Sequence, residues 1–211
     1  MTDPLYPGIN RTRSRVQFVL LGVLFFAPFV LAYSAFWLFP NWTPQGRVNY
    51  GQLITPALPV PKLALLDAAG QQVIEDPLRG KWTLVQRVTG DCDKACRREL
   101  VLTRQLHAAL GVKRERVQRV VIADEGVDIA ALKVRYGAEQ PDLVWLRDAP
   151  AASPSAAAFF ANAPANAVML VDTLGNWLMI YPHAADAEAV KRDFKGMQKD
   201  INKLLRLSSI G

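Results

Sequence analysis

A pair of cysteines between a predicted strand and a predicted helix constrains the fold more than any other feature of this sequence. Cys92 and Cys96 follow the strand-like run 82–88 and begin a stretch, 93–110, with leucines at helical spacing. Four positions apart on a helix, they share one face with Cα atoms about 6 Å apart, within reach of a disulfide. We therefore expect Cys92 at or just before the first helical turn, where unpaired N–H groups and the helix dipole favour a thiolate.

Such a cysteine pair is compatible with three kinds of chemistry. Cys92 and Cys96 can exchange disulfides with a partner, bind a soft metal such as Cu(I), or form an inert structural disulfide. Arg97 and Arg98 add positive charge nearby. From the residues alone these alternatives remain open.

An apolar run near the N-terminus predicts a membrane anchor. Residues 16–39 are 24 positions without a charge, and about 20 such residues span a bilayer core. Pro28 lies inside the run, and membrane helices tolerate proline. The run is longer than a typical signal-peptide core and lacks a small-residue cleavage site, which favours an anchor over a cleaved signal.

The charges that flank this run predict its orientation. Arg11, Arg13 and Arg15 precede it, whereas the other flank has no charge until Arg47. Positive flanks stay in the cytoplasm, so residues 1–15 are expected to be cytoplasmic and the C-terminal part to lie outside. We predict a single-pass protein of the bacterial inner (cytoplasmic) membrane with a periplasmic domain, in an oxidising compartment.

The charge of the outer part argues against a nucleic-acid partner. The chain has 25 Lys and Arg and 19 Asp and Glu. Without Arg11, Arg13, Arg15 and Asp3, 22 basic and 18 acidic residues remain, a net charge of +4. This mild excess suits an acidic partner, anionic lipid headgroups or ordinary solubility.

The remainder of the chain predicts one α/β domain. Residues 40–61 are rich in proline and are expected to be a linker, which leaves 62–211 as the folded domain. Strands are expected at 82–88, 117–123 and 143–146, with two short strands in 63–73 and a hairpin over 168–181. Helices are expected at 93–110, 128–136, 155–161 and 186–207. The alternation of strands and helices predicts a mixed sheet flanked by helices.

This arrangement resembles the thioredoxin-like fold and, within it, the Sco/SenC family of membrane-anchored cytochrome c oxidase assembly proteins. Within the outer domain the resemblance covers about residues 60–207, and the N-terminal anchor before that domain is a further shared feature. It rests on the leading hairpin 65–70, the run 79–85, the Cys92-x-x-x-Cys96 spacing and the segment 170–175 before a C-terminal helix. It implies thiol–disulfide or Cu(I) chemistry at the two cysteines and a protein partner in the respiratory chain.

The sequence departs from the family pattern in two places. Arg97 stands where Sco-like proteins usually have proline after the second cysteine. Their third copper ligand is a histidine just before the hairpin strand, but residues 162–167 contain none. The chain is therefore expected to be a divergent member without that ligand.

His183 is a candidate replacement for the missing ligand. A hairpin that pairs Val171 with Leu178 would set His183 opposite Asn166, at the strand end where the family histidine lies. The alternative is a surface histidine that follows Pro182. His107 lies eleven residues after Cys96, about 16 Å along a helix axis, and so cannot bind the same ion.

The expected function is that of a membrane-tethered thiol–disulfide and copper assembly factor of the Sco type. As an enzyme it would be a thiol–disulfide oxidoreductase with Cys92 and Cys96 as its reactive groups. The expected metal ligands are Cys92, Cys96 and His183, with Cu(I) as the metal. The alternative is a non-catalytic thioredoxin-like interaction protein whose disulfide is structural.

Overall fold

The computed structural model of the chain describes residues 11–38, 49–149, 151, 153–181 and 186–208. The chain divides into two compact units, residues 1–47 and 48–211. The two are treated separately below.

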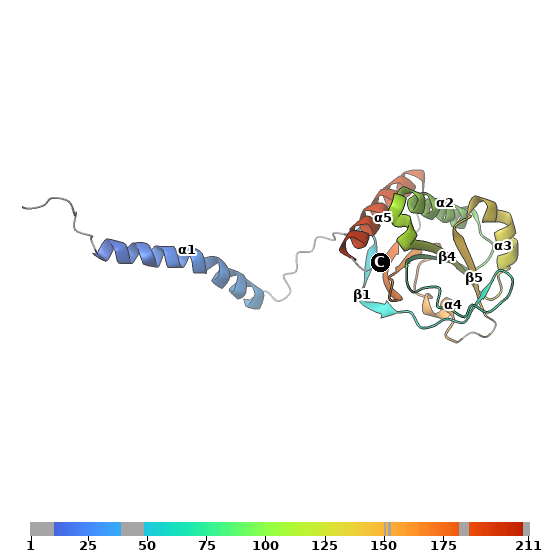
Figure 1. The fold of residues 1–211 in the computed structure, drawn as a ribbon, viewed down its shortest axis with the longest axis horizontal. Helices are drawn as coiled ribbons and strands as arrows, with labels where there is room; N and C mark the ends of the chain where they lie inside the picture. Colours follow the sequence, from blue (N-terminus) through green and yellow to red (C-terminus); the bar gives the residue numbers. More distant parts are fainter. Residues whose placement is uncertain (1–10, 39–48, 150, 152, 182–185, 209–211) are drawn as a thin grey trace, which may run out of the picture. The chain divides into compact units, whose positions relative to one another are not determined.

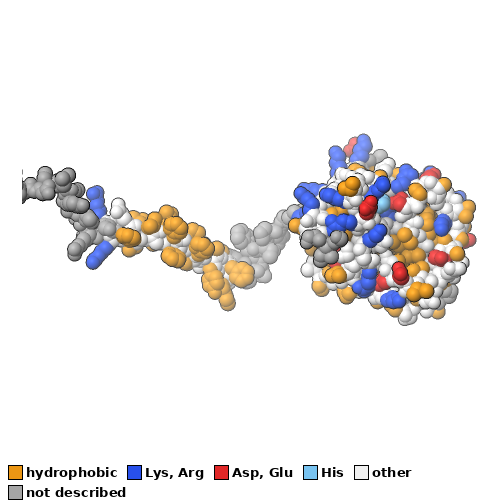
Figure 2. Space-filling view, in the orientation of Figure 1, with side chains coloured by type: hydrophobic (Ala, Val, Ile, Leu, Met, Phe, Trp, Pro, Cys, Tyr) orange, Lys and Arg blue, Asp and Glu red, His pale blue; other side chains and the backbone are white. Residues whose placement is uncertain are grey.

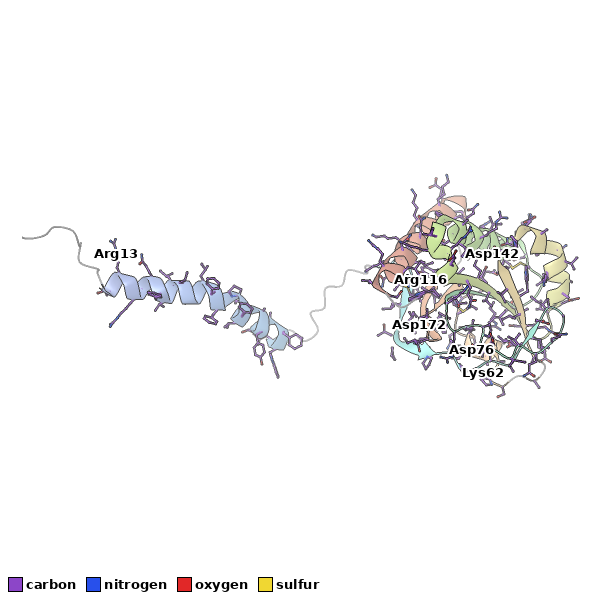
Figure 3. All side chains as sticks on the ribbon, viewed as in Figure 1. Arg13, Lys62, Asp76, Arg116, Asp142 and Asp172 are labelled. Carbon is purple, nitrogen blue, oxygen red and sulfur yellow. A yellow bond between two sulfur atoms is a disulfide. The ribbon has the colours of Figure 1, made fainter. Side chains whose placement is uncertain are left out.

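The first unit contains one long helix, α1 (Arg11–Leu38) (Figure 1). Its part from Arg15 to Leu38 is long and apolar enough to cross a membrane. Arg13 extends from the N-terminal end of this helix (Figure 3). The helix therefore covers the predicted span 16–39 up to Leu38, and residue 39 lies outside the described residues.

The second unit is built on a seven-stranded mixed sheet with strand order β1-β7-β6-β3-β4-β5-β2. The three strands β3, β4 and β5 are parallel, and the remaining pairings are antiparallel. The strands are β1 (Gln52–Pro59), β2 (Leu65–Asp67), β3 (Trp82–Val88), β4 (Val117–Ala123), β5 (Leu143–Asp148), β6 (Val168–Val171) and β7 (Asn176–Tyr181). The predicted α/β class, a thioredoxin-like mixed sheet flanked by helices, is confirmed.

Helices cover both faces of this sheet, with α2, α3 and α5 along one side and the short α4 on the other (Figure 1). The helices are α2 (Lys94–Ala109), α3 (Ile129–Tyr136), α4 (Ala156–Phe159) and α5 (Ala187–Leu207), with 3-10 turns η1 (Gly111–Arg116) and η2 (Gly137–Glu139). Each α-helix of this unit begins after a capping side chain that accepts a backbone N–H from the first turn. These caps are Asp93, Asp128, Ser155 and Asp186.

The alternation of side chains along the strands divides the core into two layers. Leu84 of β3 faces the layer that contains Leu106 of α2 and Ile201 of α5. Its neighbour Val85 faces the opposite layer, where Trp177 packs edge-on against Phe160 at 5.1 Å between ring centroids. Successive strand residues point to opposite faces, so each inner strand is buried on both sides.

The predicted linker 40–61 needs correction, because Gln52–Pro59 form strand β1. This strand pairs with β7 at Gln52 and Leu53 and again at Leu58 and Pro59, with an irregularity between. Proline cannot donate to a ladder, so a strand with two prolines is tolerated only at a sheet edge. Proline content alone therefore suggested a linker where the chain forms an edge strand.

Two further predictions are corrected in detail. Only β2 forms in the segment expected to hold two strands, and its return leg is a single bridge between Leu66 and Gln72. In the hairpin, Val168 pairs with Tyr181 as predicted, but Val171 pairs with Trp177 instead of Leu178. The register changes next to the turn, between Leu170 and Val171. In that turn, Asp172 accepts hydrogen bonds from the backbone N–H groups of Leu174 and Asn176, which supports a loop one residue shorter than predicted.

Helix α5 also holds the start of the second unit in place. The backbone N–H groups of Tyr50 and Gly51 donate to the buried carboxylate of Asp200, at 3.1 and 2.9 Å. The hydroxyl of Tyr50 donates to Asp193, which is also buried. A methyl group on Gly196 would clash with the Tyr50 ring, which explains a glycine in the middle of a helix.

Candidate thiol–disulfide site

The two cysteines lie at the edge of the sheet where the parallel strands end. β3 ends at Val88, and α2 begins at Lys94. Between and just after these points, Cys92 and Cys96 form a disulfide with a Cα–Cα distance of 5.2 Å. Both residues are nearly buried, with 6% and 5% of their surface exposed. The structure thus places Cys92 just before the first turn of α2, as predicted.

Asp93, between the cysteines, changes the electrostatics expected at this helix end. Its side chain accepts the backbone N–H of Cys96 at 2.9 Å, and its extended backbone ends the preceding loop. This carboxylate takes one of the N–H groups that were expected to favour a thiolate, and it adds a negative charge beside the sulfur atoms. The sequence signal was present, because aspartate directly before a helical run is a capping residue.

The disulfide packs in an apolar cluster shared by α2, α3 and the sheet. Its buried members are Val88, Leu100, Val121, Ala123, Ile129, Leu132, Leu143 and Trp145, besides the two cysteines. The hydroxyl of Tyr136 donates to the carbonyl oxygen of Cys92 at 3.2 Å. Helix α3 therefore fixes the loop that carries Cys92.

A pocket of about 380 Å³ adjoins the cysteine loop. It is lined by Gly90, Asp91, Gly126, Val127, Asp128, Ala131, Leu132 and Arg135. Gly90 and Asp91 directly precede Cys92, so the pocket lies next to the cysteine loop. Two carboxylates, of Asp91 and Asp128, and the guanidinium of Arg135 give its lining a polar part.

An ion pair that the sequence analysis did not anticipate joins the strand ends beside the site. The guanidinium of Arg87 donates to both oxygens of Asp124, at 2.8 Å each. These hydrogen bonds raise the pKa of Arg87. The backbone N–H of Asp124 also donates to the carbonyl oxygen of Val88 at 2.9 Å. The sequence contains the signal for this pair, because Arg87 lies in one predicted strand and Asp124 directly follows the next.

His107, which was not expected at the site, and Arg97 contact residues away from the cysteines, and His183 lies outside the described residues. His107 lies towards the far end of α2, where its Nδ1 contacts Asp142 at 2.9 Å. Arg97 pairs with Glu139 at 3.2 Å. His183 belongs to residues 182–185, outside the described ranges, so its place opposite Asn166 stays a prediction.

The donor set near the cysteines fits a soft metal poorly beyond the two sulfur atoms. In the part of the chain that the structure describes, no three His, Cys, Asp or Glu residues are grouped to hold a metal ion. Two reduced cysteines suit Cu(I), which prefers soft ligands, whereas Cu(II) also needs nitrogen or oxygen donors. Residues 162–167, which precede β6, contain no histidine.

A family model described as "Transmembrane-like, thioredoxin-like, C-terminal domain" matches residues 82–208. This range begins with β3 and extends beyond the end of α5, so it contains the cysteine loop and most of the sheet. No curated protein matches the chain.

Solved structures of Sco proteins share this fold at low sequence identity. Yeast Sco1 with copper bound is 18% identical, with a TM-score of 0.55 over 74% of this chain and 97% of that one. Apo Sco1 from Thermus thermophilus is 18% identical, with a TM-score of 0.55 over 77% and 98%. BsSco, a cytochrome c oxidase assembly protein with a disulfide switch, is 14% identical, with a TM-score of 0.54 over 77% and 99%. These likenesses show a thioredoxin-like fold.

Proposed function

The chain belongs to the family of transmembrane-like, thioredoxin-like C-terminal domains, and we propose that it is a membrane-tethered thiol–disulfide and copper assembly factor of the Sco type, acting in cytochrome c oxidase biogenesis. One observation carries the proposal: the Cys92–Cys96 disulfide lies at the N-terminus of α2, beside a pocket, at the edge where the parallel strands end. The similarity in fold to Sco1 and BsSco supports it.

The proposed reaction is thiol–disulfide exchange. A partner thiolate attacks one sulfur of the Cys92–Cys96 disulfide, forms a mixed disulfide and releases the other cysteine as a thiolate. A second partner thiolate then attacks the partner sulfur of the mixed disulfide. The partner is thereby oxidised to a disulfide by two electrons, and Cys92 and Cys96 are reduced and take up the two protons. We assign the mixed disulfide to Cys92, because Asp91 beside it lines the pocket.

Copper binding would involve the same two sulfur atoms after reduction. Cys92 lies just before α2 and Cys96 in its first turn, and the two reduced side chains can hold Cu(I) between two thiolates. His183, which lies outside the described residues, is the proposed third ligand. The chain's divergence from the family pattern, with no histidine in residues 162–167, makes Cu(I) the favoured oxidation state.

The proposed location is the bacterial inner membrane, with α1 as a single-pass anchor and the thioredoxin-like domain in the periplasm. The apolar stretch Arg15–Leu38 and the arginines on its N-terminal flank support this arrangement. A reporter fused after Gly211 that is active only in the periplasm should be active. Activity of a cytoplasm-only reporter at the same position would refute the orientation.

Redox titration of the full chain tests the proposed chemistry. In glutathione buffers, an exchanging disulfide is expected to titrate above about −300 mV, whereas structural disulfides lie below this value. Cys96→Ser should form a mixed disulfide with glutathione at Cys92, and the matched control Cys92→Ser should form it more slowly. A potential below the structural limit, or no glutathione adduct on Cys96→Ser, would remove the redox assignment.

One observation favours the alternative, a non-catalytic interaction protein with a structural disulfide. Both cysteines are almost buried within the apolar cluster, which limits attack by an external thiol. In that case the disulfide should resist reduction in the folded protein and react only after unfolding. The rate of thiol release with and without denaturant distinguishes the two functions.

A further inference from the structure

The outward face of α5 carries a continuous stripe of basic side chains. At 100° per residue, six of them fall within about 120° of the helix circumference, and they extend over roughly 22 Å of its length. The stripe consists of Lys191, Arg192, Lys195, Lys199, Lys203 and Arg206. Figure 2 shows Lys and Arg side chains gathered over this helix, which Figure 1 labels.

The acidic residues of α5 offset only a small part of this stripe. Asp193 and Asp200 are buried, and both are bound to the Tyr50–Gly51 segment. Glu188 is exposed and lies on the same face, one turn before Lys191 and Arg192, so it offsets one of the six positive charges. Within the described residues, Arg192 is the member of the stripe that contacts a carboxylate, that of Asp193 at 3.7 Å. The exposed charge of this helix face is therefore predominantly positive.

The turn η1 lies beside the C-terminal part of α5 and extends the basic surface. Arg116 donates to the carbonyl oxygen of Leu205 at 2.9 Å, and Lys113 donates to the side chain of Asn202 at 3.2 Å. Figure 3 labels Arg116. Arg114 of the same turn is exposed.

The stripe lies on the element to which the N-terminal tether is fixed. Tyr50 and Gly51 are bound to α5 through Asp193 and Asp200, and residues 39–49 separate Tyr50 from the last residue of α1. Fully extended, this segment spans at most about 40 Å. If α1 crosses a membrane, a connection of this length gives the second unit a high effective concentration at the membrane surface.

We propose that the basic stripe of α5 binds anionic phospholipid headgroups of the membrane in which α1 is anchored. The charge of the stripe complements that of the lipids, and the short tether keeps both at high effective concentration. Four of the six residues are lysines, which are depleted in protein–protein interfaces, and this composition favours a lipid surface over a protein partner. The inference rests on the proposed anchor and is independent of the thiol chemistry.

Amine acetylation of the full chain in lipid nanodiscs tests this docking. Lys191, Lys195 and Lys199 should react roughly threefold or more slowly in discs that contain phosphatidylglycerol than in discs of phosphatidylcholine alone. The exposed Lys62, Lys81 and Lys133, on other parts of the domain, should react equally in both and serve as internal controls. Protection should disappear at about 1 M salt, where the Debye length falls to about 3 Å.

Charge variants supply the matched control. Lys191→Gln, Lys195→Gln and Lys199→Gln together should remove the protection of Lys203, whereas Lys62→Gln, Lys81→Gln and Lys133→Gln together should leave it unchanged. Melting curves of both triple variants identify any loss of folding, and single Lys195→Gln provides a milder change if the triple variant unfolds.

Equal acetylation of the α5 lysines in both kinds of disc would overturn the proposal. Protection that is absent in lipid discs but present in native membranes would assign the stripe to a protein partner and would overturn it as well. A chain that fails to insert into either disc would refute the anchor, and with it this inference, but it would leave the redox titration of Cys92 and Cys96 unaffected.

Discussion

The two ends of α2 pack against buried groups of different kinds. At its N-terminal end, the Cys92–Cys96 disulfide lies among apolar side chains, and its nearby hydrogen bonds involve backbone groups. Further along the helix, Thr103 and His107 take part in a network centred on Arg119 of β4, which is 1% exposed. The N-terminal end of α2 therefore carries a disulfide, whereas the part around Thr103 and His107 packs against the buried guanidinium of β4.

The charge of Arg119 is matched in detail by its neighbours. Its guanidinium donates to the carbonyl oxygen of Leu100 at 2.8 Å and to the side chain of Gln140 at 2.7 Å. It also pairs with Asp142 at 3.1 Å. Burial lowers the pKa of Arg119, while Asp142 opposes this effect. A buried charge is tolerated only with such complete pairing.

The contrast indicates which end of α2 could undergo a chemical change without loss of the fold. Removal of any partner of Arg119 would leave a buried charge or hydrogen-bonding group without a partner, so this network is suited to a structural role. Opening of the disulfide leaves two thiol groups among apolar side chains, which a folded protein tolerates. The proposed redox chemistry fits the cysteine end of α2 better than the Arg119 network, and the following predictions test this distinction.

The largest expected effect concerns metal binding. Reduced wild-type protein should bind Cu(I) through Cys92 and Cys96 and bind Cu(II) poorly, because Cu(II) needs donors besides sulfur. Anaerobic titration should show that Cys92→Ser together with Cys96→Ser abolishes Cu(I) binding, while Asp142→Asn at the other end of α2 leaves it intact.

His183→Ala distinguishes the ligand sets in the same titration. Tight Cu(II) binding that survives His183→Ala would contradict the predicted donor set. Tight Cu(II) binding that is lost in His183→Ala would identify His183 as the third ligand. Absence of copper binding in both oxidation states, with a readily reduced disulfide, would leave thiol exchange as the function.

The next effect is on stability at the charged end. Arg119→Leu should lower the free energy of unfolding by about 3–5 kcal/mol, because it leaves Gln140 and the Leu100 carbonyl without the guanidinium and leaves Asp142 with its contact to His107 but not to Arg119. Urea denaturation measures this change. The matched control Arg114→Leu, at an exposed position of η1, should remain within about 0.5 kcal/mol of wild type. A loss below about 1 kcal/mol for Arg119→Leu would show that the network is not structural.

A smaller loss is expected when the disulfide is reduced. The cross-link closes a loop of only five residues, from Cys92 to Cys96. The chain-entropy relation then gives about 2 kcal/mol, less than the expected cost of removing the Arg119 guanidinium. Urea denaturation with and without reductant measures the difference. Unfolding on reduction alone would mean that the disulfide is the structural element and would reverse the comparison.

Sequence patterns predicted the elements that carry their own local signals. The bounds of β3, β4 and α3 match the predicted ranges, since apolar runs and the capping residue Asp128 define them. Placement of Cys92 at the start of α2 followed from the same logic. These features depend on residues that are close together in the sequence, so local patterns are enough to predict them.

Features that depend on distant partners were not predictable in this way. Arg119 interrupts an apolar strand, and its partner Asp142 lies 23 residues further along the chain. The edge strand β1 forms only because β7 offers a free edge to a proline-rich segment. Likewise, Gly196 is explained only by the ring of Tyr50, which is far away in sequence. Each requires knowledge of tertiary packing that no local pattern contains.

The smallest expected effect is a loss, at low pH, of the stability that Asp142 contributes at the Arg119 end of α2. Burial alone would raise the pKa of Asp142, but the charge and hydrogen bonds of Arg119 outweigh it, so the pKa lies below its ordinary value of 3.8. A depressed folded-state pKa contributes stability above the ordinary pKa, and this contribution is lost as the pH falls through the folded-state value. The stability difference between wild type and Asp142→Asn should therefore be constant above about pH 5 and shrink below 3.8. Urea denaturation at several pH values measures this difference, and an unchanged difference for Asp142→Asn at low pH would show that Arg119 does not hold this carboxylate in its charged form.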